Sequence, residues 1–265
     1  MAPDRVHPPG VVCTELAKIY PGGTEAVRGM DLSFDAGKTT ALVGPSGCGK
    51  STVLRMIAGL EAPTAGKVEI GGAPPAETLK RAGLSVAFQD PSLLPWRTVR
   101  GNIELALRLA RKAQDRTAVD QLIKLVGLDG FAETRPAALS GGMRQRAAIA
   151  RALATEPSLL LLDEPFGAVD ELTRRQLAQD LPRLWEARGT TTVLVTHSVT
   201  EAVMLSDRVV VLSTRPAEIV ADIPVNLSRP RSPETARLKA FQDHVDSVSA
   251  ALSKGMASSQ PLAAQ

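Results

Sequence analysis

Residues 44–51 have the types and the spacing of a phosphate-binding loop. Their sequence, GPSGCGKS, fits the pattern G-x-x-x-x-G-K-S/T, follows a short apolar run and precedes a helical pattern over 52–58. Glycines let the backbone curl so that several N–H groups point at phosphate oxygens, and the start of the helix adds its positive dipole end. Lys50 can then reach the terminal phosphates of a nucleotide, and the Ser51 hydroxyl can hold Mg²⁺. The residues that we expect to bind the nucleotide here are Gly44, Pro45, Ser46, Gly47, Cys48, Gly49, Lys50, Ser51 and Thr52.

Two adjacent carboxylates, Asp163 and Glu164, follow the apolar run 159–162. Holding a metal ion and activating a water molecule need separate groups, and a neighbouring pair supplies both. Asp163 at the end of a strand can orient the ligand shell of Mg²⁺, and Glu164 can polarise the attacking water. The alternative is a pair of surface acids at a strand end, which the phosphate loop elsewhere in the chain disfavours.

Four short apolar runs each end directly in a polar or glycine-rich element. They are 41–43 before Gly44, 84–88 before Gln89, 159–162 before Asp163, and 193–196 before His197. Continuous rather than alternating apolarity is typical of strands that helices cover on both faces, as in a parallel sheet. Ligands of such sheets bind beyond the carboxyl ends of the strands. We therefore expect all four runs to deliver their polar residues to one edge of an α/β core.

The pattern between the second and third of these strands is helical. Apolar residues recur at helical spacing over 102–112 and 116–126. We predict a core over 11–88 and 156–215, with a helical subdomain inserted over 89–155.

We predict that the segment 216–265 is a C-terminal tail. It contains several prolines and a short helical pattern around 235–245. We expect its small, polar end, from Ser253 onward, to be disordered.

Composition narrows the class of protein. Hydrophobic residues make up 44% and charged residues 22% of the 265 residues, which is ordinary for a soluble globular protein. The 31 Lys and Arg against 28 Asp and Glu leave a net charge of +3, too little to indicate nucleic-acid binding. The N-terminus lacks a signal peptide, and no apolar run is long enough to span a bilayer. Cys13 and Cys48 are the only cysteines, and we interpret both as free thiols in a reducing cytosol.

Residues 139–146, LSGGMRQR, resemble the signature sequence of the ABC ATPases. Ser140 can cap the helix that begins there, and Gly141 and Gly142 permit close backbone approach to an anion. The alternative is that residues 139–146 are only the capped start of an ordinary helix. The resemblance implies that this helix start completes the nucleotide site of a second ATPase subunit, so that two ATP molecules lie between facing copies.

Other residues match the same family in the same order. The resemblance implies that Tyr20 stacks on adenine, that Gln89 contacts Mg²⁺ and reports the nucleotide state, and that His197 contacts the γ-phosphate. It also implies that Asp170, in the loop 167–170, crosses the dimer interface. Glu164, His197 and Lys50 would be the catalytic residues, and Ser51, Gln89 and Asp163 would hold the metal. A surface or core tyrosine and a surface amide remain the alternatives for Tyr20 and Gln89.

The stretches 88–99 and 163–167 are similar to the ATPase subunits of the nitrate/sulfonate/taurine importer group, as is the Arg-Pro-Arg of 229–231. The resemblance implies a P-loop NTPase core of mainly parallel sheet, with an N-terminal antiparallel β portion and the inserted helical subdomain. It also implies a peripheral protein on the cytoplasmic face of the cell membrane. Two permease subunits, a second ATPase subunit and, indirectly, an extracytoplasmic solute-binding protein would be its partners.

Several alternatives stay open at this stage. An exporter or a lipid-extracting system shares the catalytic motifs, and the solute (nitrate, a sulfonate, taurine or a similar compound) is not specified by this subunit. A nucleic-acid-associated ABC ATPase is disfavoured by the single cassette and the weak charge. Leu93, Leu94 and Trp96 either pack into their own subdomain or receive a helix of a partner.

Overall fold

The computed structural model describes residues 8–257, and its central element is a six-stranded sheet. The strand order is β5 (Leu84–Ala87), β6 (Leu159–Asp163), β7 (Thr191–Val195), β3 (Thr39–Val43), β8 (Arg208–Leu212) and β9 (Ile219–Pro224). Every neighbouring pair is parallel except β8 and β9, which are antiparallel. β3, β6 and β7 are buried along their whole length. The predicted parallel sheet is confirmed. Its continuous apolar runs are buried along their length, as expected for strands that are covered on both faces.

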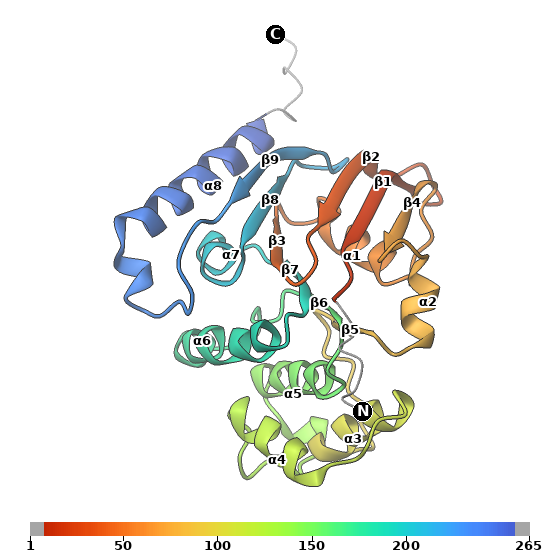
Figure 1. Ribbon diagram of the computed structural model, residues 1–265, viewed down its shortest axis with the longest axis vertical. Helices are drawn as coiled ribbons and strands as arrows, with labels where there is room; N and C mark the ends of the chain where they lie inside the picture. Colours follow the sequence, from red (N-terminus) through yellow and green to blue (C-terminus); the bar gives the residue numbers. More distant parts are fainter. Residues whose placement is uncertain (1–7, 258–265) are drawn as a thin grey trace, which may run out of the picture.

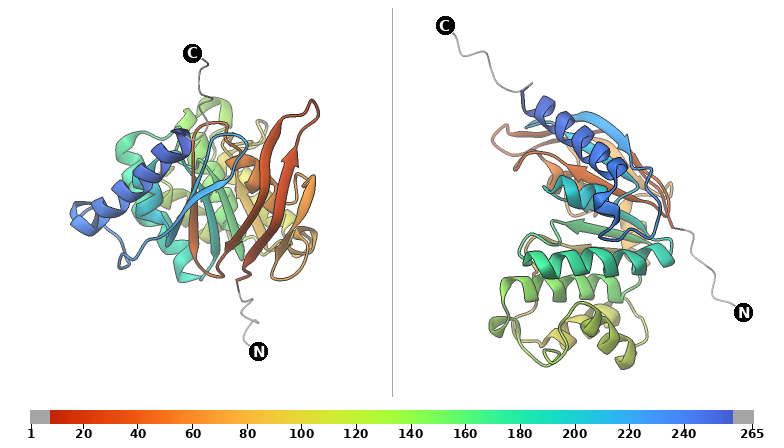
Figure 2. Two further views of the ribbon diagram at one scale, coloured as in Figure 1. Left: turned by 90° about the horizontal axis from the view of Figure 1, so that it is seen from above. Right: turned by 90° about the vertical axis from the view of Figure 1, so that its left-hand side faces the viewer.

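A second, three-stranded sheet lies beside the first one (Figures 1 and 2). It is antiparallel and consists of β2 (Glu25–Phe34), β1 (Val11–Ile19) and β4 (Ala65–Ile70). Val11, Cys13 and Leu16 of β1 pack into one core with α1 (Lys50–Ile57) and the central sheet. This sheet is the expected N-terminal antiparallel portion, and it supports the helix that follows the phosphate loop.

A helical layer is inserted between β5 and β6 and forms the lower part of Figure 1. Its elements are α3 (Val99–Leu109), α4 (Arg116–Leu125), the short η1 (Pro136–Ala138) and α5 (Gly141–Ala154). α3 begins three residues before the predicted 102 because the Thr98 side chain accepts a hydrogen bond from the backbone N–H of Gly101. Asp115 caps α4 in the same way. Ile103, Leu107, Val119 and Ile123 face inward and join α3 and α4 to α5.

The remaining helices are α2 (Pro75–Lys80), α6 (Glu171–Ala187), α7 (Val199–Leu205), η2 (Thr235–Arg237) and α8 (Lys239–Ala257). α7 and α8 pack against strands of the central sheet, and α6 joins the same apolar core, whereas α2 contacts β4 of the antiparallel sheet and η2 contacts α8. Figure 1 and the right-hand view of Figure 2 both show α6 lying between α7 and α5. Of the helices that the structure describes, none combines the length and the apolar character that crossing a bilayer requires.

The segment after residue 215 is more ordered than expected. β9 pairs with β8, so the central sheet continues past the residue at which we expected the core to end. α8 runs to Ala257, so the expected disorder from Ser253 is wrong for 253–257, and 258–265 lie outside the described residues. The physical reason is packing: Phe241, Val248 and Gly255 are buried, and a Cβ built on Gly255 would lie 2.9 Å from Val220 Cγ2.

Arg231, in the Arg-Pro-Arg segment of the tail, is 7% exposed and is anchored by backbone oxygens. Its guanidinium donates to the carbonyl oxygens of Val203, Met204 and Ser206 at the end of α7. Two further bonds reach the carbonyl oxygens of Val225 and Leu227. Carbonyls at the end of a helix have no partner within the helix, so Arg231 serves as a C-terminal cap supplied by a distant segment.

We expect Arg231→Ala to lower the free energy of unfolding by about 2–4 kcal/mol, because several buried carbonyls would lose their donor. For a chain of this size the melting temperature should fall by roughly 5–10 °C. Arg237→Ala, at an exposed position of η2, is the control and should change it little. Calorimetry of the two variants measures the difference, and equal melting temperatures would contradict the capping role.

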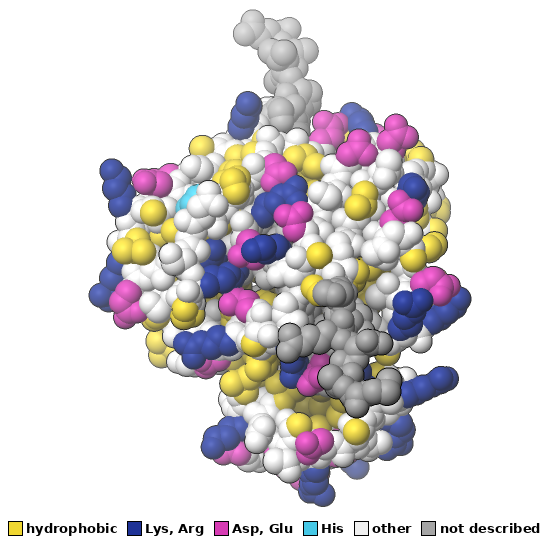
Figure 3. All heavy atoms as spheres, in the orientation of Figure 1, with side chains coloured by type: hydrophobic (Ala, Val, Ile, Leu, Met, Phe, Trp, Pro, Cys, Tyr) yellow, Lys and Arg dark blue, Asp and Glu magenta, His cyan; other side chains and the backbone are white. Residues whose placement is uncertain are grey.

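Positive and negative side chains are interspersed on the face shown in Figure 3, and no single-sign field covers it. Apolar side chains gather where the helical layer meets the sheet core. This mixed surface agrees with the small net charge of +3.

Candidate functional site

The phosphate loop connects β3 to α1, as the sequence predicted. Gly49 precedes α1 and has φ 127°, a conformation that favours glycine. A Cβ at this position would lie only 2.6 Å from the carbonyl oxygen of Ala26 in β2. The loop therefore requires glycine both for its backbone conformation and for its close approach to the antiparallel sheet.

Lys50 and Ser51 begin α1 and point toward different partners. The Lys50 ammonium is buried and donates to the carbonyl oxygens of Gly44 and Pro45, each at 2.8 Å. The Ser51 hydroxyl donates to Asp163 Oδ1 at 3.0 Å, which joins the loop to the end of β6. Burial raises the pKa of the Asp163 carboxyl, and the hydrogen bond from Ser51 opposes this rise. A hydroxyl, a carboxylate and an ammonium group thus lie close together at the start of α1.

Glu164 is the meeting point of three neighbouring strand ends. Gln89, just past β5, donates from Nε2 to Glu164 Oε2 at 3.2 Å. His197, just past β7, has Nδ1 at 3.4 Å from the same oxygen. Glu164 itself has φ 48°, a left-handed conformation that costs a non-glycine residue free energy. The carboxylate lies at the edge of the sheet, between the amide of Gln89 and the imidazole of His197.

A cavity of about 300 Å³ opens over the phosphate loop. Its lining residues are Tyr20, Thr24, Ala26, Ser46, Gly47, Cys48, Gly49, Lys50, Ser51, Thr52, Gln89, Glu164 and Arg215. Tyr20 follows β1, and its hydroxyl lies 3.3 Å from Thr52 Oγ1. Lys18 Nζ lies 5.1 Å from the centre of the Tyr20 ring, within reach of a cation–π contact. The fold thus brings Tyr20, Gln89 and Glu164 to the phosphate loop from three separate parts of the chain.

The predicted residues of the signature segment lie elsewhere and do not line this cavity. Ser140 caps α5 by accepting from the backbone N–H of Met143 at 3.2 Å. A Cβ on Gly142 would lie 2.8 Å from the carbonyl oxygen of Ala168, so only glycine fits against that loop. Gly141 begins α5 between these two residues. The start of α5 is therefore a second helix N-terminus that is not directed at its own chain's phosphate loop.

Asp170 also lies outside the cavity. Its Oδ1 accepts from the backbone N–H of Thr173 at 3.0 Å and thereby caps α6. This hydrogen bond lowers the pKa of the Asp170 carboxyl. Asp170 follows directly on the loop that contacts Gly142, which places it beside the start of α5.

Three lining residues, Thr24, Ala26 and Arg215, were missed from the sequence. Arg215 follows β8, and its Nη2 donates to the carbonyl oxygen of Gly47 at 2.7 Å. β8 neighbours β3 in the sheet, so the rule that polar residues gather at the carboxyl ends of parallel strands could have identified Arg215. Thr24 lies in a turn before β2, and no sequence signal points to it.

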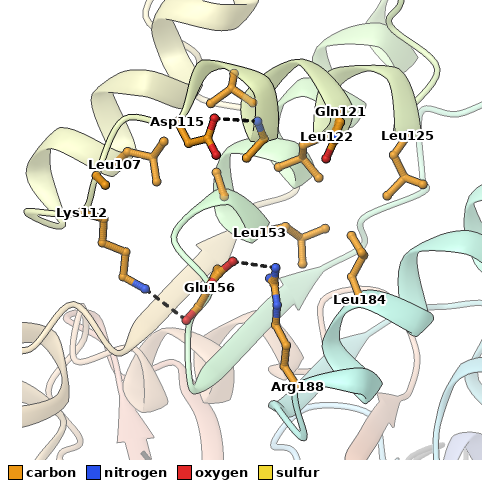
Figure 4. A pocket seen from close by; sticks show the side chains of 14 residues that line it. Leu107, Lys112, Asp115, Gln121, Leu122, Leu125, Leu153, Glu156, Leu184 and Arg188 are labelled. Carbon is orange, nitrogen blue, oxygen red and sulfur yellow. Dashed lines mark hydrogen bonds and ion pairs between the residues drawn. The ribbon is translucent and has the colours of Figure 1, made fainter. Parts of the chain in front are cut away.

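A larger cavity of about 630 Å³ lies between the helical layer and the core (Figure 4). Leu122, Leu125, Leu153 and Leu184 line it, and the ion pair between Arg188 and Glu156 closes one side. Its walls are mainly apolar side chains, whereas the phosphate-loop cavity is lined by loop glycines, by hydroxyl-bearing residues and by the cationic Lys50 and Arg215. The smaller cavity is therefore the one with the chemistry to bind a nucleotide.

A glycine loop between a parallel strand and a helix, with its lysine, its serine and an acid pair on a neighbouring strand, defines a P-loop nucleoside triphosphatase. The ABC transporter family model matches residues 27–167. The aliphatic sulfonates import ATP-binding protein SsuB of Rhodopseudomonas palustris is 45% identical over 225 residues, covering 84% of this chain and 78% of that protein. The chain belongs to the ATP-binding subunits of the ABC transporter family.

Two further comparisons agree with this assignment. The bicarbonate transport ATP-binding protein CmpC of Synechococcus elongatus is 48% identical over 234 residues, covering 83% of this chain and 34% of that longer protein. A dimeric post-hydrolysis structure of the ATP-binding cassette MJ0796, bound to ADP and Pi, superimposes with a TM-score of 0.75 at 31% identity. That likeness covers 82% of this chain and all of the cassette. The fold is therefore that of an ABC ATPase, as predicted.

Proposed function

We propose that the chain is the ATP-hydrolysing subunit of an ABC importer, acting at the cytoplasmic face of the cell membrane. The observation that carries this proposal is the convergence of Gln89 and His197 on Glu164 beside the phosphate loop. A carboxylate placed there can orient and polarise a water molecule for attack on a terminal phosphate. The sequence relatives that are named for import of sulfonates and transport of bicarbonate support the transport role.

The residues that line the cavity, together with His197 beside Glu164, divide the work of hydrolysis. Backbone N–H groups of the loop and the Lys50 ammonium hold the phosphates, and the ring of Tyr20 supports the base. Glu164 holds the attacking water, and His197 lies beside it to contact the γ-phosphate. Stabilising the charge that builds up on the phosphate oxygens in the transition state is the largest contribution that such fixed groups make.

The oxygens of Ser51, Asp163 and Gln89 suit Mg²⁺, which prefers hard oxygen ligands. Within residues 8–257 no cluster of three or more carboxylate, histidine or cysteine side chains could hold a metal ion by itself. A cation held there would take one carboxylate, that of Asp163, with the oxygens of Ser51 and Gln89, and would complete its shell with phosphate and water. When bound, Mg²⁺ neutralises charge on the β- and γ-phosphates.

A second copy of the chain would complete each nucleotide site. The start of α5 presents the N–H groups of a capped helix away from its own phosphate loop, and such a helix end attracts anions. The MJ0796 cassette is dimeric. We propose that Ser140, Gly141 and Gly142 contact the ATP held by a partner's loop, with Asp170 beside the interface. Segment 89–155 would move as a subdomain when the copies close on ATP.

The permease subunits would dock at a different groove, which lies beside β5, α3 and α5. A cavity of about 440 Å³ there is lined by Phe88, Leu94, Leu105 and other apolar residues. Trp96 nearby is 67% exposed, whereas Leu93 packs into its own core. α5 holds this stretch through Arg151, which donates to the carbonyl oxygens of Pro91 and Ser92. A helix of a membrane partner fits such an apolar groove beside the Gln89 loop.

We propose a small anion, such as a sulfonate, as the transported solute, delivered by an extracytoplasmic solute-binding protein. The relatives named for aliphatic sulfonates and for bicarbonate both handle small anions. Growth of a deletion strain on single sulfur and nitrogen sources tests this. Loss of growth on one anionic source is expected. Unchanged growth on all of them, together with a defect in secretion or in lipid transfer, would favour the export alternative.

Ser140→Arg should abolish ATP turnover while each monomer stays folded. Ser140 is exposed, so the monomer can accommodate the larger side chain, but an arginine there would occupy the space of the partner's phosphate. Loss of the cap costs about 1 kcal/mol, and Ser140→Ala serves as the control for that stability loss. Steady-state hydrolysis and thermal unfolding are measured together. A folded Ser140→Arg variant with full turnover would contradict the shared site.

A further inference from the structure

Glu201 is a largely buried carboxylate that the proposed hydrolysis does not use. It lies in the first turn of α7, and its side chain is 13% exposed. Burial raises its pKa, against the opposing effects of a hydrogen bond from Thr196 and the charge of Arg174. The Thr196 hydroxyl donates to Glu201 Oε2 at 2.7 Å, and Arg174 Nε lies 3.6 Å from Oε1. Burying an acid is costly unless its partners compensate, so this arrangement calls for a reason.

The contacts of Glu201 differ from those of an ordinary capping residue. Ser198 caps α7, and its Oγ accepts from the backbone N–H of Glu201. In a capping box the glutamate would accept from the backbone N–H of Ser198 in return. Here that N–H donates to Thr196 Oγ1 at 3.0 Å, and the Glu201 carboxylate binds the Thr196 hydroxyl instead. Glu201 therefore binds Thr196, the residue immediately before His197, rather than the backbone at the N-terminal end of α7.

Arg174 connects the same carboxylate to a second loop. Its Nη2 donates to the carbonyl oxygen of Val169 at 3.0 Å. The loop that contains Val169 lies against Gly142, where a Cβ would come within 2.8 Å of the Ala168 carbonyl oxygen. Figures 1 and 2 show α6, which carries Arg174, between α7 and α5. A continuous set of contacts thus runs from α7 through Arg174 to the start of α5.

The pair between Arg174 and Glu201 is not fully closed. Arg174 Nε is buried and makes no hydrogen bond, although it lies 3.6 Å from Glu201 Oε1. A hydrogen bond of ordinary length, about 2.9 Å, needs a shift of well under 1 Å between α6 and α7. The pair can therefore tighten when these helices move slightly.

From these contacts we infer that Glu201 is a positioning residue that, through Thr196, sets the place of the His197 loop. Its pair with Arg174 ties that loop to the segment around Val169, and hence to the helix start that serves the partner's nucleotide. The inference rests on the proposed ATP hydrolysis at this site. Neither Glu201 nor Arg174 lines the phosphate-loop cavity, so both act through the position of other residues.

Glu201→Gln keeps the size of the side chain and removes its charge. The amide has one acceptor oxygen and one NH₂ group, so a donor must face either Thr196 or Arg174 where an acceptor stood before. We expect kcat for ATP hydrolysis to fall roughly 10–100-fold, the scale of misplacing a reacting group by a fraction of an ångström to 1 Å. KM for ATP should stay within about threefold, because the nucleotide contacts are intact.

Matched variants separate positioning from general damage. Arg174 has a second carboxylate neighbour, Glu171, whose Oε2 lies 3.8 Å from Nη1 and whose side chain is 59% exposed. Glu171→Gln should therefore turn over ATP at the wild-type rate. Arg174→Gln should reproduce the loss in kcat. The double variant Glu201→Gln/Arg174→Gln should lose no more than the more damaged single variant, because the two residues act as one pair.

The outcomes decide between the claims. Wild-type turnover by a folded Glu201→Gln variant, or fully multiplicative losses in the double variant, overturns the positioning role while the ATPase assignment stands. Absence of hydrolysis by the wild-type protein with its membrane partners overturns the proposed function instead. If thermal unfolding shows that Glu201→Gln is too unstable to assay, Arg174→Gln decides alone, and its wild-type turnover would overturn the role.

Discussion

Glu164→Gln is expected to retain ATP binding, to lose turnover and to hold two copies of the chain together on ATP. The amide keeps the shape of the carboxylate but cannot polarise water, and loss of a positioned general base lowers a rate by roughly 10²–10⁴-fold. The ATP that bridges the two copies then persists. Steady-state hydrolysis, binding of a fluorescent nucleotide and light scattering after gel filtration with ATP measure the three effects.

The structure offers a matched control for this substitution. Glu156 also has a left-handed backbone conformation, with φ 45° against 48° for Glu164, and its exposed side chain pairs with Arg188. Glu156→Gln repeats the chemical change in the same backbone setting, away from the phosphate loop, and should leave turnover unchanged. Turnover of Glu164→Gln near the wild-type rate would refute the role of Glu164. A strictly monomeric Glu164→Gln protein in ATP, alone and with its membrane partners, would refute the shared site.

Lys50→Ala should weaken transition-state stabilisation by roughly 2–4 kcal/mol, the scale of losing one preorganised donor. By the relation between rate and barrier this is a fall of about 30- to 900-fold in turnover. The reason is the place of Lys50: among the residues lining the cavity it is the cation at the start of α1, buried inside the loop. Single-turnover hydrolysis at saturating ATP measures the change in the chemical step.

Stability must be followed alongside the activity of Lys50→Ala. The ammonium donates to two carbonyl oxygens of its own loop, so its removal also loosens the loop. Thermal unfolding without nucleotide reports that part separately. Lys80→Ala, at an exposed position near the end of α2, is the control for general effects of removing a lysine. A fall in turnover of less than about fivefold would contradict the assigned role, which requires the larger loss.

Local sequence determined the individual elements of this protein. The glycine loop, the lysine and the serine are neighbours in the chain, so their joint geometry follows from one strand, one turn and one helix start. The apolar runs predicted their own burial and parallel pairing, because strands covered on both faces have no polar alternation. The same reasoning placed Gln89, Glu164 and His197 at one edge of the sheet. In the structure Gln89 and His197 both lie within 3.4 Å of Glu164 Oε2.

Tertiary structure alone decided the contacts that depend on strand order and on packing at long range. The strands β5, β6, β7 and β3 lie side by side in this order. Glu164, which follows β6, therefore lies between Gln89 and His197. Arg215 at the loop and the pair of Glu201 with Arg174 belong to no motif. The Arg-Pro-Arg stretch of 229–231 was noticed in the sequence, but nothing in it predicted that Arg231 caps α7. Likewise, α8 extends beyond its periodic stretch because Gly255 fits closely against β9. The residues in each of these contacts lie close together because other elements pack between and around them. Their spacing along the chain therefore does not predict the contact.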